Sequence, residues 1–315
     1  MTLADKVLAG DLMAIARAIS WAENDVPEKE TLIDKLFHRG GRALVVGITG
    51  APGAGKSTLV DRLITCYRGM DKKVAVIAVD PSSPFTGGAI LGDRLRMQNH
   101  AVDDKVFIRS MASRGHLGGV ARATGDAIKI FDAAGYDIVL IETIGVGQTE
   151  IEVTGMSDIV LLVLVPGMGD EIQVLKAGIM EIGDVFLINK SDRPEAARLA
   201  AEVEYVLGLG ERRQENPVLM ISALFDQGIE EAVRTVDAFY QRMQSDGRLA
   251  QRRKRRLAME IQSIMRDKIE GHLVRKIASD EQLAEWAGKL LSREASPYAL
   301  IREKLGPLLE QMEKS

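Results

Sequence analysis

One stretch near the beginning of the chain, GITGAPGAGKST (residues 47–58), constrains the fold more than any other. Residues 50–57 match the pattern G-x-x-x-x-G-K-[ST] in full, between an apolar run and a helical one. Glycines let successive backbone N–H groups curl around a phosphate, and the amino end of the following helix adds its positive dipole. The stretch therefore predicts a phosphate-binding loop (P-loop) between a strand and a helix. It indicates a nucleoside triphosphate without identifying the base.

The residues of this loop have separate expected roles. Lys56 is expected to reach the β and γ phosphates, and the Ser57 hydroxyl is expected to be a ligand of Mg²⁺. The other residues expected to surround the phosphates are Gly50, Ala51, Pro52, Gly53, Ala54, Gly55 and Thr58.

Seven short aliphatic runs, separated by helical stretches, predict a sheet. Near-continuous apolar strands joined by helices are typical of a mostly parallel sheet with helices on both faces. The expected fold is therefore α/β, of the P-loop NTPase type. The runs are ALVVGIT (43–49), VAVIAVD (74–80), VFIRS (106–110), DIVLIE (137–142), DIVLLVLV (158–165), DVFLIN (184–189) and PVLMIS (217–222).

Three parts of the chain are expected. Residues 1–40 have apolar residues at helical spacing and predict two amphipathic helices, residues 41–245 form the P-loop domain, and residues 246–315 predict a helical extension. The basic run 252–256 lies at the beginning of that extension. We interpret it as a solvated helix face or an edge of a dimer contact, because no aromatic residues interleave with it as they would in a nucleic-acid site.

Composition excludes several classes of protein. The formal net charge of -4 gives no overall attraction to nucleic acid or to an anionic membrane. The single cysteine, Cys66, excludes an internal disulfide and is interpreted as a packing residue in a reducing compartment. No apolar run approaches the ~20 residues that span a bilayer, and the N-terminus lacks the pattern of a signal peptide. We expect a cytoplasmic protein, or a mitochondrial matrix protein in a eukaryote, that binds neither nucleic acid nor membrane.

A second motif indicates which base is bound. The tetrapeptide NKSD (residues 189–192) follows a predicted buried strand, at the edge where ligands bind in open α/β sheets. One carboxylate, Asp192, can accept both the N1–H and the 2-amino group of guanine, whereas adenine would leave it unpaired. Asn189 suits the O6/N7 edge of the purine, and the Lys190 stem can lie against the ring. Ser222-Ala223, after the last strand, is expected to offer a backbone N–H to O6.

Three carboxylates are candidates for a Mg²⁺ site together with Ser57. Asp80 ends VAVIAVD, Asp93 lies in AILGDRLRM, and Glu142 ends DIVLIE. Mg²⁺ prefers oxygen ligands and retains several waters. Thr86, in the loop between Asp80 and Asp93, is an alternative ligand to Asp93.

The order and spacing of these motifs resemble the MeaB/ArgK family of P-loop GTPases, the G-protein chaperones associated with methylmalonyl-CoA mutase. Members of this family are similar to the signal-recognition and metallochaperone GTPases, the SIMIBI-type G domains. The resemblance covers about residues 45–225. It is carried by GAPGAGKST, VDPSSPFTGGAILGDRLRM, RGHLGG, ETIGVGQTE, VPGMGDEIQ and NKSD.

The resemblance implies hydrolysis of GTP to GDP and phosphate, slow until a partner stimulates it. It implies that Lys56, Asp93 and Glu142 act in catalysis, and that Lys176 couples hydrolysis to the partner. The implied partner is an adenosylcobalamin-dependent methylmalonyl-CoA mutase or a related acyl-CoA mutase, whose cofactor loading the protein would gate and which it would protect from inactivation. The C-terminal helices are implied to form a homodimer. Small GTPases place a glutamine directly after the switch glycine, whereas here Gln148 lies three residues after Gly145.

Two other functions remain open. A P-loop kinase or ATPase acting on a small molecule or a transport protein would prefer ATP, and the NKSD motif argues against it. A nucleotide-bound interaction module would show little turnover. Delivery of a metal such as nickel is disfavoured, because the four histidines lack the spacing of metal ligands. They are His38, His100, His116 and His272.

Overall fold

A computed structural model describes residues 1–80, 100, 102–112, 119–143, 155–167, 179–209, 216–277 and 280–313. The contacts within the chain divide it into two compact units, Met1–Arg253 and Lys254–Ser315. The first unit holds the predicted N-terminal helices and P-loop domain, and it also includes the first residues of the predicted C-terminal extension.

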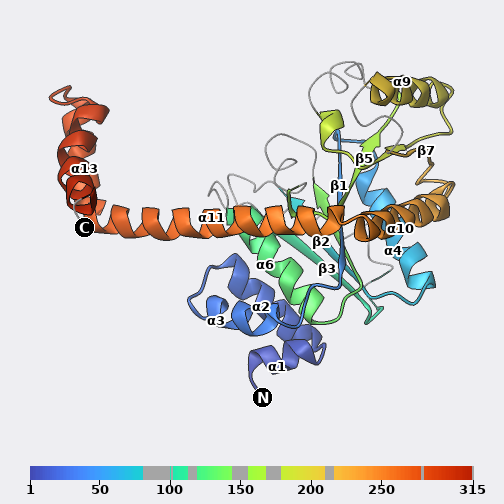
Figure 1. Cartoon of the computed structure of the whole chain (residues 1–315), viewed down its shortest axis with the longest axis horizontal. Helices are drawn as coiled ribbons and strands as arrows, with labels where there is room; N and C mark the ends of the chain where they lie inside the picture. Colours follow the sequence, from blue (N-terminus) through green and yellow to red (C-terminus); the bar gives the residue numbers. More distant parts are fainter. Residues whose placement is uncertain are drawn as a thin grey trace. The chain divides into compact units, whose positions relative to one another are not determined.

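The first unit is built on a seven-stranded sheet in which every strand pairing is parallel (Figure 1). The strand order is β3-β2-β4-β1-β5-β6-β7. The predicted α/β fold is confirmed, and each of the seven aliphatic runs contributes one strand. The strands are β1 (Leu44–Gly50), β2 (Val74–Asp80), β3 (Val106–Ala112), β4 (Ile138–Thr143), β5 (Ile159–Leu164), β6 (Val185–Ile188) and β7 (Val218–Met220).

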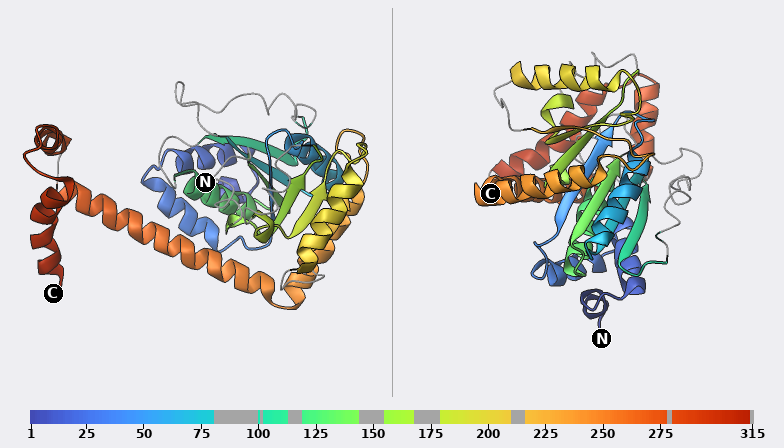
Figure 2. Two further views of the ribbon diagram at one scale, coloured as in Figure 1. Left: turned by 90° about the horizontal axis from the view of Figure 1, so that it is seen from above. Right: turned by 90° about the vertical axis from the view of Figure 1, so that its right-hand side faces the viewer.

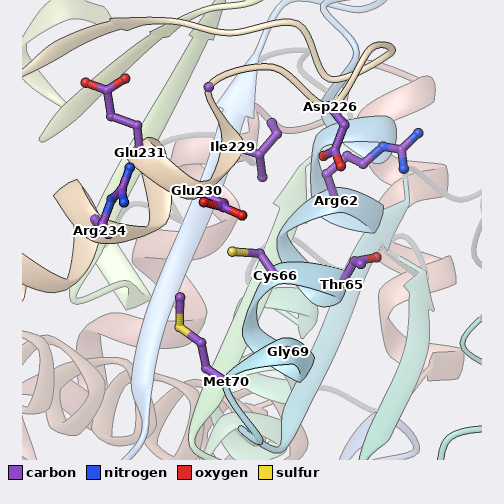
Figure 3. A pocket seen from close by; sticks show the side chains of 11 residues that line it. Arg62, Thr65, Cys66, Gly69, Met70, Asp226, Ile229, Glu230, Glu231 and Arg234 are labelled. Carbon is purple, nitrogen blue, oxygen red and sulfur yellow. The ribbon is translucent and has the colours of Figure 1, made fainter.

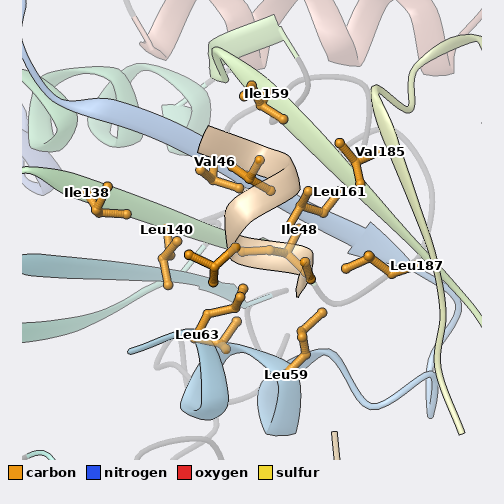
Figure 4. Close-up of a cluster of buried hydrophobic side chains, with 14 of the residues drawn as sticks. Val46, Ile48, Leu59, Leu63, Ile138, Leu140, Ile159, Leu161, Val185 and Leu187 are labelled. Atoms are coloured by element: carbon orange, nitrogen blue, oxygen red, sulfur yellow. The ribbon is translucent and has the colours of Figure 1, made fainter. Parts of the chain in front are cut away.

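Alternation along the strands produces a separate apolar core on each face of the sheet. On one face, side chains such as Val46 and Ile48 pack against Leu59 and Leu63 of helix α4 (Lys56–Gly69), and helix α10 (Ile229–Ser245) completes this layer (Figure 4). Cys66 of α4 packs at the margin of the same core, as predicted, and burial raises the pKa of its thiol.

The opposite face is covered by helix α6 (Gly119–Ala133) together with the N-terminal helices, and by helix α9 (Ala196–Leu209) over β5 and β6 (Figure 2). Residues 1–40 form three helices rather than the predicted two: α1 (Leu3–Leu8), α2 (Leu12–Glu23) and α3 (Glu28–Phe37). The first break arises because Gly10 has a φ of 78° and Asp11 caps the next helix by accepting the Ala14 N–H at 2.9 Å.

An aspartate lies directly before each of three strands, β4, β5 and β6, at the amino edge of the sheet. Asp137, before β4, accepts the N–H of Lys73 at 2.8 Å. Asp158, before β5, accepts the N–H of Val45 at 3.2 Å, and Asp184, before β6, accepts the N–H of Val160 at 2.9 Å. Each carboxylate thus bonds to the backbone of the adjoining strand, which helps to set the strand register.

Helix α11 (Arg248–Ile277) is attached to two of these aspartates by its second turn. Arg252 forms a bidentate pair with Asp184, at 2.6 and 2.8 Å, and donates to the carbonyl of Asp158 at 2.7 Å. Arg253 binds both oxygens of Asp158, at 3.0 and 2.5 Å, and also reaches the carbonyls of Gly41 and Ala43. The interpretation of the basic run as a solvated or dimer-facing surface is therefore wrong for Arg252 and Arg253.

These ion pairs, which we call the arginine clamp (Arg252–Asp184 and Arg253–Asp158), are largely buried. The Asp158 side chain is 0% exposed. Burial alone would lower the pKa of each guanidinium, but the hydrogen bonds and charges of Asp184 and Asp158 raise it above its usual value. Bidentate pairs in such surroundings have full geometric complementarity, and loss of one partner leaves a buried charge behind.

The second unit contains the remainder of α11, with α12 (Asp280–Leu291) and α13 (Pro297–Glu313). Trp286 and Leu300 form a small buried cluster. An apolar stripe on α11 stays exposed and consists of Leu257, Ile261, Ile264, Met265 and Ile269. Among the described residues, no helix has the length and apolar character to cross a membrane.

The arginine clamp makes a prediction about stability. Replacing Arg253 by alanine should lower the free energy of unfolding by about 3–5 kcal/mol, because Asp158 would be left as a buried, uncompensated charge. Urea denaturation of the full chain measures the change. Arg255→Ala is the matched control: Arg255 is exposed two residues further along the same helix, and its replacement should change stability by no more than about 0.5 kcal/mol. Equal effects of the two substitutions would contradict a stabilising role for the clamp.

Candidate functional site

The predicted P-loop joins the end of β1 to the beginning of α4, and its glycines are required by close contacts. A Cβ on Gly50 would lie 2.2 Å from the carbonyl oxygen of Val163, and a Cβ on Gly55 would lie 2.5 Å from the side-chain nitrogen of Asn189. Gly53 and Gly55 also have positive φ angles, 77° and 87°. Any side chain at these positions would displace the loop.

Lys56 is the first residue of α4, and its side chain folds back over the loop. Its Nζ donates to the carbonyls of Gly50 at 2.7 Å and Ala51 at 3.1 Å, and the residue is only 6% exposed. The helix N-cap, Gly55, provides no side-chain cap for the first N–H groups. A buried ammonium and the amino end of a helix thus meet at one loop, which is the chemistry expected of a phosphate site.

Ser57 and Glu142, both predicted near the metal, are in direct contact. The Ser57 hydroxyl donates to Glu142 Oε1 at 2.6 Å. Because an ionised carboxylate can only accept, the serine hydroxyl is the donor in this bond. Glu142 is 4% exposed at the end of β4, where it pairs in register with Ile48 of β1 and Ala78 of β2.

The other metal candidates are less fully described. Asp80 ends β2, next to β4, so that it reaches the same carboxyl edge of the sheet as Glu142. The predicted site residues Asp93 and Lys176 lie outside the described residues, as do Thr86, His116 and Gln148. Among the described residues, no group of three or more His, Cys, Asp or Glu side chains could hold a metal ion, but Ser57 and Glu142 bring together two oxygen donors of the kind that Mg²⁺ prefers.

Asn189 connects three loops. It follows β6 and is 3% exposed. Its Nδ2 donates to the carbonyl of Ala54 in the P-loop at 2.8 Å, and its Oδ1 accepts the N–H groups of Lys190 at 2.9 Å and Ala223 at 3.0 Å. The Ala223 N–H, which the sequence suggested for purine O6, is thus bonded to Asn189 in this structure. These three hydrogen bonds of the Asn189 side chain thus join loops around the site.

Lys190 and Asp192 of the same NKSD loop bond to the P-loop and to Ser222, respectively. Lys190 has a φ of 60°, and its Nζ donates to the carbonyl of Gly53 at 2.9 Å, so its stem crosses towards the P-loop. Asp192 is exposed, and its Oδ1 accepts a hydrogen bond at 2.9 Å from the buried hydroxyl of Ser222. The structure therefore brings together all three predicted sequence segments: the P-loop, NKSD and Ser222-Ala223.

One contact of Ala223 was not expected from the sequence. Arg62 of α4 donates from Nε to the carbonyl of Ala223 at 3.1 Å. Nothing in the helical stretch around Arg62 distinguishes it from an ordinary exposed arginine, and the residue it binds is separated from it by 161 positions.

A P-loop and an N-K-x-D loop at the carboxyl edge of a parallel sheet define a P-loop GTPase. Residues 15–278 match the family described as methylmalonyl Co-A mutase-associated GTPase MeaB. The chain belongs to this family, which confirms the resemblance seen in its motifs.

Named relatives agree with this assignment. The chain is 42% identical over 312 residues to a putative GTPase of Pyrococcus horikoshii, covering 96% of this chain and 97% of the relative. It is 36% identical over 274 residues to the GTPase ArgK of Escherichia coli, covering 84% and 83%. A solved structure of a protein named LAO/AO transport system kinase superposes with a TM-score of 0.72 at 27% identity, covering 99% of this chain and 96% of that one. The protein is a GTPase.

The glycine contacts lead to a second prediction. Gly55→Ala should weaken binding of GTP and GDP at least about tenfold, because the added Cβ is strained at this φ and collides with Asn189. Titration of a fluorescent guanine nucleotide measures the affinity. Gly69→Ala is the control: Gly69 lies in the last turn of the same helix, and a Cβ there would meet nothing within 4 Å. Unchanged affinity in Gly55→Ala would show that the loop does not hold the phosphates as described.

Proposed function

We propose that this GTPase is a nucleotide-dependent chaperone of an adenosylcobalamin-dependent methylmalonyl-CoA mutase or a related acyl-CoA mutase. The observation that carries the proposal is the family match over residues 15–278, which extends from the N-terminal helices through the site into helix α11. The protein would gate loading of the mutase cofactor and protect the mutase from inactivation. We place it with the mutase in the cytoplasm, or in the mitochondrial matrix of a eukaryote.

In the proposed reaction, a water oxygen bonds to the γ-phosphorus of GTP, the bond to the bridging oxygen of GDP breaks, and the water proton leaves with the phosphate. Mg²⁺, when bound, would neutralise charge on the phosphate oxygens. Ser57, Asp80, Asp93 and Glu142 are the proposed residues of its site. Glu142 orients the Ser57 hydroxyl by accepting its hydrogen bond at 2.6 Å.

The remaining steps use groups that the fold already holds in place. Lys56 Nζ lies over the P-loop carbonyls, from which it can move to the β and γ phosphates as charge develops there. Helix α4 begins at Lys56, directly after the same loop, and its N-cap Gly55 provides no side-chain hydrogen bond. Lys56, Asp93 and Glu142 are the proposed catalytic residues. Lys176 is proposed to link hydrolysis to the mutase, which would explain slow turnover of the protein alone.

The base is proposed to bind at Asp192. This side chain is exposed, but its Oδ1 is held by Ser222, so that the carboxylate is oriented before a ligand arrives. Such preorganisation lowers the cost of binding. The Lys190 stem, fixed by its bond to Gly53, provides one apolar wall beside it.

The exposed stripe on α11 supports a proposed homodimer. Five large apolar side chains that are between 38% and 59% exposed lie along this helix at helical spacing. Burying them against the same stripe of a second subunit would remove them from water.

A P-loop kinase or ATPase acting on a small molecule or transport protein is the alternative. The similar solved structure is named for a transport system kinase, and that name favours this alternative. Guanine recognition at Asp192, in contrast, would disfavour ATP as the phosphate donor. Relative affinities for GTP and ATP separate the two functions, and tighter binding of ATP would support the kinase.

The proposed recognition of guanine by Asp192 leads to a third prediction. Asp192→Asn should shift nucleotide preference from GTP to xanthosine triphosphate, because an amide can donate to the 2-oxo group of xanthine where a carboxylate accepts from the 2-amino group. The ratio of dissociation constants should change by roughly 100-fold or more, given the discrimination of paired hydrogen bonds. Competition binding with both nucleotides measures the ratio. An unchanged ratio would assign base reading to another residue.

The chaperone role gives a fourth prediction. The tagged full-length protein, loaded with a non-hydrolysable GTP analogue, should retain the cobalamin-dependent mutase of the same organism on affinity resin to a different extent than with GDP. Purified mutase should also accelerate GTP hydrolysis. Lys56→Ala, which should bind nucleotide poorly, is the control and should lose the difference between the two nucleotides. Absence of both retention and stimulation would reject the mutase as partner.

A further inference from the structure

The loop that carries Ser222-Ala223 is a closed turn. Ser222 and Gln227 form an antiparallel bridge with two backbone hydrogen bonds of 3.0 Å, N–H of each to the carbonyl of the other. Asp226 and Gly228 have positive φ angles, 57° and 73°, and a Cβ on Gly228 would lie 2.8 Å from the carbonyl of Met220. The turn thus has little internal freedom, and its position depends on what holds it from outside.

Ala223 is held from both sides. Its N–H donates to Asn189 Oδ1 at 3.0 Å, and its carbonyl accepts from Arg62 Nε at 3.1 Å. Asn189 belongs to the NKSD loop, whereas Arg62 belongs to α4, six residues after Lys56. Helix α4 therefore carries Lys56 and Ser57 of the proposed phosphate site at its beginning. Less than two turns later it carries the guanidinium of Arg62, which bonds to the turn that contains Ser222-Ala223.

Arg62 has no other role among the described residues. Its only hydrogen bond there is to Ala223, and it forms no ion pair with the described part of the chain. The guanidinium borders a cavity of about 740 Å³ between α4 and the beginning of α10, shown in Figure 3. Asp226, Glu230 and Glu231 line the same cavity, yet none of them pairs with Arg62. Arg62 thus bonds to a backbone carbonyl of the turn and to none of the three carboxylates that line the same cavity.

We propose that Arg62 is a positioning residue for nucleotide binding: it sets the distance between the P-loop and the turn that carries Ser222-Ala223, so that one ligand reaches both. The inference rests on the proposed base-reading role of NKSD and this turn. Arg62 acts through Ala223 and Ser222, and Ser222 in turn orients Asp192. Its loss should weaken nucleotide binding and leave the hydrolytic step unchanged, because Lys56, Ser57 and Glu142 keep their own contacts.

Two substitutions isolate the hydrogen bond. In Arg62→Gln the side-chain nitrogen Nε2 occupies the same place along the chain as Nε of arginine, so the donor to Ala223 is retained without the charge. In Arg62→Met the side chain has similar length but no donor, and both replacements are good helix formers. Arg62→Met should raise the dissociation constants of GTP and GDP about tenfold, and Arg62→Gln by less than about threefold. The kcat at saturating GTP should remain within about twofold for both.

Arg234→Ala is the matched control, since Arg234 is an exposed arginine of α10 that lines the same cavity and forms no hydrogen bond with Ala223. It should leave affinity and kcat unchanged. Glu142→Gln provides the contrasting pattern, with reduced kcat. Thermal unfolding of each variant confirms that affinity is compared between folded proteins.

The outcomes separate the inference from the function on which it rests. If Asp192→Asn changes the base preference but Arg62→Met binds GTP like the unmodified protein, the role of Arg62 is overturned and base reading stands. Equal losses in the Gln and Met variants would also overturn it, because the hydrogen bond would not be responsible. A fall in kcat without loss of affinity would place Arg62 in the chemical step. If Asp192→Asn leaves the nucleotide preference unchanged, guanine recognition by Asp192 is rejected, and the inference about Arg62 is rejected with it.

Discussion

The nucleotide edge of the sheet depends on the buried amide of Asn189. Its nitrogen reaches the P-loop at Ala54 and its oxygen holds Ala223, so that loops far apart in the sequence share one fixed point. Both ends of a buried amide must be paired, because an unpaired polar group in this environment costs free energy. Gly55 has no Cβ, and this absence gives the Asn189 nitrogen room beside the loop. The glycine pattern of the P-loop therefore serves packing against Asn189 as well as access for phosphate.

The two edges of the sheet are organised by different chemistry. At the carboxyl edge, Lys56 and Ser57 form hydrogen bonds that a ligand can exchange for its own. At the amino edge, Asp137, Asp158 and Asp184 accept backbone N–H groups, and the arginine clamp covers two of them. The amino edge is thus held by buried ion pairs, whereas the carboxyl edge has hydrogen bonds that can be exchanged.

Local patterns predicted the sheet and the three site segments, because each depends on neighbouring residues. Apolar runs predicted all seven strands, and G-x-x-x-x-G-K-[ST] predicted the loop and the beginning of α4. Contacts over long separations could not be predicted in this way. The basic run 252–256 has the local pattern of a solvated helix face, yet Arg253 meets a carboxylate 95 positions away. The partners of Arg62 and of the Ala223 N–H depend equally on the tertiary fold.

The arginine clamp also determines where the chain can be divided. A fragment that ended at residue 245, after α10, would expose the amino edge and leave Asp158 and Asp184 without the guanidinium groups that neutralise them. A fragment that ended at Arg253 would retain both pairs and correspond to the first compact unit. The first turns of α11 are thus a structural part of the GTPase domain. A junction with C-terminal helices of another chain therefore has to follow Arg253 if both ion pairs are to be retained.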